Sequence, residues 1–480
     1  MFRAFCGFVG MLGIAATLPS SQAAPAADYV ALVSQATLQA PGWSNVVAAL
    51  AAQRPTRVVT YPGPLSLDLR ARLASPHPRY VCLVARPEEV TRAFVATTHK
   101  LLRRLDDDPY VDCFWGILTG YHASNALAIA RTRKPLIVRR VAGGTAFALA
   151  LCEEGQWYDE LKPRRWVKKE RGGAPEELQG PRDTTEAMVR LLNEYQPDLF
   201  ITSGHATERD WQLGFAYRNG SFRHADGRLF GRDLAGRTYP VDSPNPKVYL
   251  PIGNCLMGHI DRPDCMATAW MNSAGVRQMI GYTVPTWYGY AGWGMLDYFV
   301  EQPGRYTFAE AFVANQQALL HRLAVFFPEL LTVDVPPGRR PPRPVRVNER
   351  ARAAGLCAQD GLGLLYDRDT LAFYGNPAWV ARMAPAPLAW RQTLTETNGV
   401  FTFTIRPRDR DSFAPINRNG VQRGGRPFIA FLPHRIQPAR LLEGAELEPV
   451  ITDDFVLVPR PNPDQPAQPL RVRFTAAPAQ

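Results

Sequence analysis

Two short apolar runs, each leading into a reactive side chain, constrain this sequence more than any other feature. The run at 199–202 leads into Gly204-His205, and the run at 248–252 leads into Gly253-Asn254-Cys255. Apolar runs of about four or five residues between turn formers are typical of buried strands in a parallel sheet. In such sheets, functional residues usually lie just beyond the carboxyl ends of the strands. Because neighbouring strands lie about 4.8 Å apart, a His after one strand and a Cys after the next can approach each other. The pattern therefore predicts a thiol nucleophile with an imidazole base.

The first residues have the pattern of a secretory signal peptide. Arg3 precedes an apolar run over 5–18, and Ser21-Gln22-Ala23 supplies small residues at the expected cleavage positions. We therefore expect residues 1–23 to be removed and the mature protein to be secreted or periplasmic. No later run approaches the roughly 18 apolar residues of a membrane span, so none is expected.

Cysteine content leaves two interpretations of Cys255 open. Seven cysteines occur in 480 residues, and six remain once Cys6 is removed with the signal peptide. So few cysteines do not make a disulfide scaffold. Because an even number permits full pairing, a bridged Cys255 is the alternative to a free nucleophile.

The chain is basic, with a net charge of +11 and its densest basic run at 162–171. Such a charge favours association with anionic surfaces but says nothing about the fold. We interpret the run as an exposed loop, with a docking or processing site as the alternative. Nucleic acid is not expected as a partner, because no helix-turn-helix, zinc-finger or base-stacking motif accompanies the run.

Alternation of helical and strand patterns predicts an α/β fold with a mostly parallel sheet. Capping signatures at Asp183–Glu186 and Thr307–Glu310 mark two helix starts. We expect helical segments at 24–55, 91–105, 125–131, 184–195, 261–275 and 307–326. We expect strands at 57–61, 80–84, 111–118, 147–151, 199–202, 247–252, 276–281, 363–366 and 373–377.

The character of the chain changes near Trp390. Short segments with alternating apolar residues recur at 400–405, 428–432, 455–458 and 470–474, separated by Pro, Asn and Gly. Short, regularly spaced strands of this kind are typical of a β-sandwich. We therefore expect residues 386–480 to form an Ig-like β-sandwich.

The motifs at the two strand ends extend beyond the reactive residues. They read TSGHATERDW over 202–211 and GNCLMG over 253–258. This pattern resembles that of the gingipain-type peptidases, which belong to the caspase-like clan of cysteine peptidases. Weaker similarity to the same family is found at 108–116 and 374–377. The resemblance covers about residues 55–385. It implies a caspase-like fold, with an N-terminal α/β subdomain at 24–150 and a catalytic subdomain at 151–385, and an exported endopeptidase acting on protein or peptide substrates.

The resemblance also implies a role for each residue of the two motifs. Cys255 attacks a peptide carbonyl and His205 moves the protons. The backbone N–H groups of Ala206 and Cys255 hold the developing oxyanion, a contribution of about 3 kcal/mol per donor. Gly204 and Gly253 allow tight backbone turns beside the substrate.

Specificity is implied to come from an acid that lines a pocket for Arg or Lys side chains. Glu153, Glu154 and Asp159 all lie in the corresponding region, and we prefer Asp159. An exposed loop acid is the alternative. Trp287 and Tyr288 follow the strand after Cys255 and are expected to form a pocket wall, with core packing as the alternative.

One departure from the family pattern and two other groups of residues keep other functions open. The family usually has Gly after the catalytic His, whereas Ala206 stands here, so a catalytically inactive binding scaffold is the second hypothesis. His224, Cys255, His259 and Cys265 contain candidate zinc ligands, but their spacing is irregular. A hydrolase nucleophile elbow at 253–258 lacks its second Gly, because Met257 occupies that position. We expect no metal and no cofactor, and a structural calcium ion stays open.

Overall fold

The computed structural model describes residues 28–75, 77–339, 344–417 and 422–479. The predicted signal peptide at 1–23 lies outside the described residues. In the described part of the chain, no helix is long and apolar enough to cross a membrane.

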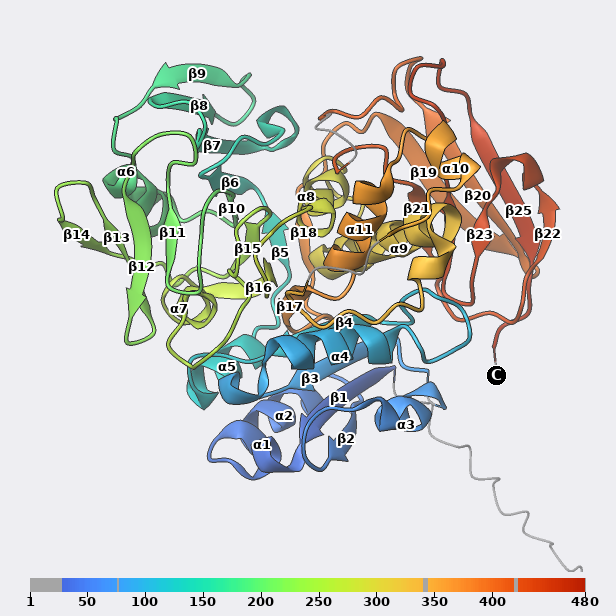
Figure 1. The fold of residues 1–480 in the computed structure, drawn as a ribbon, viewed down its shortest axis with the longest axis horizontal. Coiled ribbons are helices and arrows are strands. Elements are labelled where there is room, and N and C mark those ends of the chain that lie inside the picture. Colours follow the sequence, from blue (N-terminus) through green and yellow to red (C-terminus); the bar gives the residue numbers. More distant parts are fainter. Residues whose placement is uncertain (1–27, 76, 340–343, 418–421, 480) are drawn as a thin grey trace, which may run out of the picture.

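A single twelve-stranded sheet organises the chain on both sides of residue 150 (Figure 1). Neighbouring strands run parallel except at the pairs β17/β16, β7/β8 and β8/β9. The expected mostly parallel sheet is therefore confirmed. Its strands, in spatial order, are β2 (Arg57–Tyr61), β1 (Tyr29–Ser34), β3 (Tyr80–Val84), β4 (Phe114–Leu118), β17 (Leu371–Gly375), β16 (Val276–Tyr282), β15 (Lys247–Pro251), β10 (Leu199–Thr202), β6 (Arg140–Gly143), β7 (Glu154–Tyr158), β8 (Arg165–Lys169) and β9 (Glu176–Gln179).

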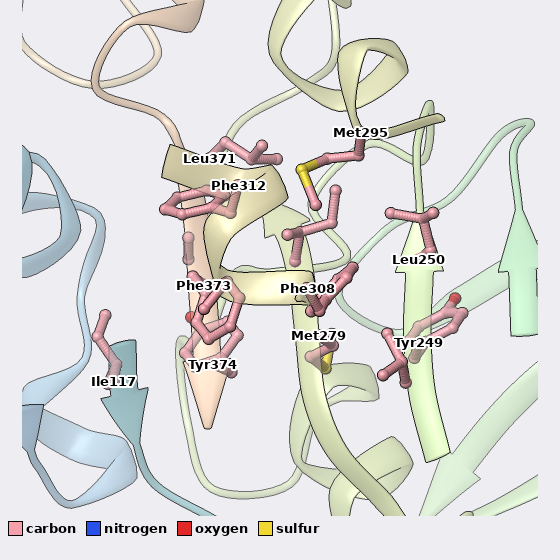
Figure 2. Close-up of a cluster of buried hydrophobic side chains, with 14 of the residues drawn as sticks. Ile117, Tyr249, Leu250, Met279, Met295, Phe308, Phe312, Leu371, Phe373 and Tyr374 are labelled. Atoms are coloured by element: carbon pink, nitrogen blue, oxygen red, sulfur yellow. The ribbon is translucent and has the colours of Figure 1, made fainter. Parts of the chain in front are cut away.

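Helices cover this sheet, and α9 shows why they pack on it. Phe308 and Phe312 of α9 lie beside Phe373 of β17, with ring centroids 5.5 and 5.2 Å from it (Figure 2). The predicted capping box is present, because Thr307 and Glu310 exchange side-chain-to-backbone hydrogen bonds. The helices are α1 (Gln35–Gln39), α2 (Trp43–Ala51), α3 (Arg70–Ala74), α4 (Arg92–Leu102), α5 (Ala123–Ala130), α6 (Thr185–Arg190), α7 (Met266–Ser273), α8 (Tyr290–Met295), α9 (Phe308–Phe326), α10 (Glu349–Ala353) and α11 (Ala358–Asp367).

Smaller sheets, most of them antiparallel, complete the fold. One follows His205 and contains β11 (Asp210–Gln212), β12 (Ser221–Ala225), β13 (Arg228–Arg232) and β14 (Thr238–Pro240). Strands β5 (Leu136–Val138) and β18 (Ala381–Met383) form a parallel pair. The C-terminal residues form a sheet of β19 (Trp390–Thr397), β20 (Val400–Pro407), β25 (Leu470–Thr475) and β22 (Arg440–Glu443), and another of β21 (Phe428–Phe431), β24 (Phe455–Val458) and β23 (Val450–Ile451).

The two C-terminal sheets contribute side chains to one separate apolar core. Phe403 and Val472 come from the first sheet, and Phe428 and Val456 come from the second. All four expected strand segments of this region are strands. The Ig-like assignment and the division at residues 150 and 385 stay predictions.

Four expected elements differ from the structure. Residues 29–34 form β1 instead of a helix, since all six are buried in a sheet interior where alternation disappears. The segment 147–151 contains a 3₁₀ turn at Leu149–Leu151, because short apolar runs are ambiguous in period. Residues 363–366 belong to α11, where a Cβ on Gly363 would lie 2.2 Å from the Tyr288 ring. Half of the expected basic loop is strand β8.

Candidate active site

The ends of β10 and β15 place the two predicted catalytic residues at one edge of the sheet. The strands are parallel neighbours with Thr202 opposite Pro251, and Ile252 N–H continues the ladder by donating to the Thr202 carbonyl at 2.9 Å. His205 lies three residues beyond the end of β10, and Cys255 lies four residues beyond the end of β15. The topology thus brings both turns together at the carboxyl edge of the sheet.

A buried side chain links the two turns directly. Asn254 donates its amide to the Gly204 carbonyl at 3.2 Å and accepts a hydrogen bond from the Thr202 hydroxyl at 2.6 Å. The Thr202 hydroxyl also lies 3.0 Å from the Tyr249 hydroxyl. Because Asn254 is fully buried, these bonds fix the position of the turn that carries Cys255.

Cys255 is a half-buried free thiol. All six cysteines in the described residues are free, so the disulfide alternative for Cys255 is not seen there. Its sulfur accepts a hydrogen bond from the backbone N–H of Thr286 at 3.2 Å. Leu256, the next residue, has the left-handed φ of +58°, a conformation that non-glycine residues adopt at an energetic cost. The thiol therefore lies on a sharp turn and faces a backbone donor.

His205 is exposed and packs against an aromatic ring. Its imidazole stacks on Phe215 with ring centroids 4.5 Å apart and an interplanar angle of 26°. The His205 carbonyl accepts the Gln212 N–H at 2.9 Å, which anchors its backbone. Over the described residues, no hydrogen bond reaches either ring nitrogen. Stacking is thus the contact that orients the imidazole.

The residues around His205 explain the shape of its loop. Trp211 is fully buried and donates its indole N–H to the Ser203 carbonyl at 2.8 Å. Ala206, the expected oxyanion donor, is buried and forms an isolated bridge with Trp211. Gly204 has a φ of +98°, which favours glycine. A Cβ on Gly253 would lie 2.5 Å from the Ser203 hydroxyl, so the two turns approach more closely than a larger residue permits.

A pocket of about 510 Å³ opens beside these two turns. The five residues predicted to bind substrate all line it, namely Asp159, Gly204, Gly253, Trp287 and Tyr288. Trp287 is 43% exposed, whereas Tyr288 is buried and donates its hydroxyl to Asp360 at 2.8 Å. Trp287 therefore offers an open aromatic face to the pocket, and Tyr288 packs into the core beneath it.

The carboxylate of Asp159 is engaged within its own loop. It accepts the backbone N–H groups of Leu161 and Lys162 at 2.8 and 3.2 Å, and it forms an ion pair with Arg165 at 3.0 Å. These bonds leave it little capacity for a ligand. Glu153 and Glu154, the other acids considered, pair with Arg139 and Arg171.

Glu160 is the pocket acid that the sequence reasoning missed. One oxygen accepts the Thr145 hydroxyl at 2.7 Å, while the other, Oε2, is buried and has no hydrogen-bond partner within the described residues. Burial raises the pKa of Glu160 to about 7, against the opposing effect of the Thr145 hydrogen bond. Its carbonyl accepts the Phe215 N–H at 2.8 Å, which connects the acid to the ring under His205. Its position two residues beyond β7 was a signal that could have identified it.

Two further contributions to the pocket had no signal in the sequence. Thr286 acts through its backbone N–H, which no residue type reveals. Arg423 comes from the C-terminal region, lines the pocket, and stacks over Trp293 at 4.5 Å. Its Nε and Nη2 atoms are buried and have no hydrogen-bond partner in the described part of the chain.

Metal-ligating side chains gather elsewhere in the described residues. Asp106, Asp108 and Asp112 form one group and His77, Asp106 and Asp453 another, each with ligand atoms within 4.8 Å of one another. Carboxylate oxygens suit Ca²⁺, but Asp106, Asp108 and Asp112 each accept a nearby backbone N–H and so act as turn caps. Two of the candidate zinc ligands have other partners. His224 contacts Asp264, and Cys265 contacts Thr268.

Comparison with known proteins finds likeness only among solved structures. No protein family and no curated protein matches this chain. The crystal structure of the Arg-specific cysteine proteinase gingipain R (RgpB) aligns with a TM-score of 0.45 and 11% identity, over 90% of this chain and 91% of that one. A complex of the pro- and mature domains of Porphyromonas gingivalis RgpB aligns with a TM-score of 0.42 and 10% identity, over 90% and 93%.

Proposed function

We propose that this protein is an exported cysteine endopeptidase, with Cys255 as the nucleophile and His205 as the proton carrier. The observation that carries the proposal is the pairing of β10 with β15, whose turns are joined by the Asn254 hydrogen bond to Gly204. The free thiol at the second turn and the pocket beside it support the same conclusion. In this proposal residues 24–150 form an N-terminal subdomain, residues 151–385 form the catalytic subdomain, and residues 386–480 form an Ig-like support.

The proposed reaction proceeds by two acyl transfers. His205 takes the proton from the Cys255 sulfur, and the thiolate forms a bond to the peptide carbonyl carbon. The backbone N–H groups of Ala206 and Cys255 hold the resulting oxyanion. Collapse of this intermediate breaks the C–N bond, and His205 gives its proton to the leaving amine. Water then hydrolyses the thioester, which releases the acid and restores the thiol.

We propose that the pocket prefers basic side chains of the substrate. In this proposal Glu160, in place of Asp159, is the residue that recognises them. Glu160 has an unpartnered buried oxygen, whereas the oxygens of Asp159 are already bonded. A guanidinium or ammonium group beside Glu160 would satisfy that oxygen and favour its ionised form. The exposed face of Trp287 offers a wall for the aliphatic stem of such a side chain.

A second candidate function is that of a catalytically inactive binding protein. The observation that favours it is the imidazole of His205, which has no hydrogen-bonded orienting group among the described residues. Ala206 at the expected oxyanion position adds to this case. Such a protein would hold peptides in the pocket without cleaving them.

A peptide probe that ends in arginine and carries a thiol-reactive ketone separates the two functions. The endopeptidase assignment expects the probe to modify Cys255, detected by mass spectrometry, and to lose that reaction in His205→Ala. Cys357 is exposed, so its labelling by iodoacetamide provides an internal control for thiol chemistry. If Cys357 reacts with iodoacetamide while Cys255 stays unmodified by the probe, the inactive-scaffold function is correct.

A further inference from the structure

A second pocket, of about 650 Å³, is lined by residues of α9, α10 and the loops of the C-terminal region. Figure 1 shows where these elements lie in the fold. Four arginines line it, namely Arg322, Arg350, Arg423 and Arg460. In the described part of the chain, no Asp or Glu side chain lines it. His321 lines it as well, but burial lowers the pKa of His321 to about 4, so its ring is neutral. We call this the arginine pocket.

The deeper arginines of this pocket are held in place by packing. Arg460 donates its Nε–H to the Phe413 carbonyl at 2.9 Å, and its guanidinium carbon lies 4.7 Å from the centre of the Trp390 ring. Burial lowers the pKa of Arg460 to about 10. Two buried nitrogens of Arg423, Nε and Nη2, have no hydrogen-bond partner among the described residues. Their positive charges are therefore fixed and partly desolvated, a state that is costly without a counter-charge.

Of the acids that act on these arginines, Asp297 and Glu301 have other partners, and Glu160 lies in the lining of the candidate active-site pocket. Asp297 pairs with Arg426 at 2.7 Å, and Glu301 accepts the Asn417 amide at 2.7 Å. Burial also raises the pKa of Glu301, which weakens its contribution as an anion. At the rim, the exposed Glu448 pairs with Arg350. The interior of the arginine pocket thus keeps an excess of positive charge.

We propose that the arginine pocket binds a small molecule that carries several phosphate or carboxylate groups. Guanidinium groups present planar N–H donors that match the oxygens of such anions, often with two hydrogen bonds each. A volume of about 650 Å³ lies in the ordinary range of small-molecule sites. The fixed orientation of Arg460 means that little side-chain freedom is lost on binding. The site adjoins the candidate active-site pocket, because Arg423 lines both, but anion binding does not require the proposed peptidase activity.

Calorimetry with pyrophosphate and with citrate tests this site on the full chain at physiological salt, where weak surface attraction is screened. We expect one of the two anions to bind, which also identifies the preferred oxyanion. Arg423→Gln and Arg350→Gln should each weaken that binding about tenfold, the effect of roughly 1.4 kcal/mol. Arg440→Gln is the matched control, because Arg440 is an exposed arginine on β22 outside the pocket.

Arg350 lies at the exposed rim, so its substitution tests the site even if Arg423→Gln fails to fold. Circular dichroism of each variant identifies such a failure. The proposal is overturned if neither anion binds to the folded protein. It is equally overturned if the Arg350 and Arg440 variants bind the anion as tightly as each other, because net charge alone would then account for binding.

Discussion

The side-chain amide of Asn254 donates a hydrogen bond to the backbone carbonyl of Gly204, across the two turns that carry Cys255 and His205. The contact joins positions fifty residues apart in the sequence. Its other end is fixed by the Thr202 hydroxyl at 2.6 Å. The two turns that carry the candidate catalytic residues are therefore joined by a fully buried amide outside the pair.

Asn254→Ala should impair activity as well as stability. The substitution removes the hydrogen bond to Gly204 and leaves a buried carbonyl unpaired, which costs about 1–3 kcal/mol of the free energy of unfolding. Misalignment of the turn should also lower kcat. Asn272→Ala removes a comparable bond, to the Gly227 carbonyl, away from the two turns. Urea denaturation and peptide hydrolysis measure both variants, and equal kcat values for them would contradict the linking role.

Glu160→Gln should abolish the preference for arginine in peptide substrates. The measurement is the ratio of kcat/KM for an arginine peptide to that for its citrulline counterpart, which has nearly the same shape but is neutral and has a carbonyl oxygen in place of one guanidinium nitrogen. Loss of the carboxylate should reduce this ratio about tenfold or more, as charged hydrogen bonds contribute about 1.5–3 kcal/mol. Asp159→Asn is the matched control, because that carboxylate is bonded within its loop. A larger loss in Asp159→Asn would reverse the assignment.

The same ratio should depend on pH. Burial raises the pKa of Glu160 to about 7, so in the free protein the carboxyl is neutral below that value and ionised above it. The arginine-to-citrulline ratio should therefore increase as pH rises from about 6 to 8, and Glu160→Gln should remove the increase. The effect of Glu160 on the free energy of unfolding has the opposite pH dependence. Between the ordinary carboxyl pKa and 7, Glu160 is protonated more in the folded state than in the unfolded state, so stability decreases as pH rises. That contribution to folding is present at low pH and is lost as pH rises through 7.

Arg103→Ala should destabilise the fold strongly. Arg103 follows α4 and forms a buried two-point ion pair with Asp369, which precedes β17, at 2.6 and 3.3 Å. Its removal leaves a buried carboxylate short of one partner, a change that costs about 3–5 kcal/mol. The exposed Arg190–Glu186 pair is the control, since Arg190→Ala should cost under about 1 kcal/mol. Similar melting temperatures for the two variants would show that the buried pair contributes little.

The sequence predicts best where its local signals agree with tertiary packing. The capping box of Thr307 and Glu310 predicts the start of α9. The apolar runs before His205 and Cys255 predict β10 and β15. Both kinds of signal are local patterns in the sequence. The strand β1 was misassigned since a strand buried on both faces has no alternation. Glu160 and Arg423 were missed for another reason. The pocket joins loops that lie far apart in the chain, and no local pattern reports which carboxylate keeps an unpaired oxygen.

Hydrolysis of a peptide library by the wild-type protein and by Cys255→Ala tests the central claim most directly. Alanine lacks only the thiol group of cysteine, and position 255 is half-buried. The fold should therefore tolerate the substitution, and the circular dichroism spectrum should be unchanged. We expect the wild type to cleave peptides, with preference for those that place arginine or lysine before the cleaved bond, and Cys255→Ala to cleave none. Equal cleavage by the two proteins would contradict the account.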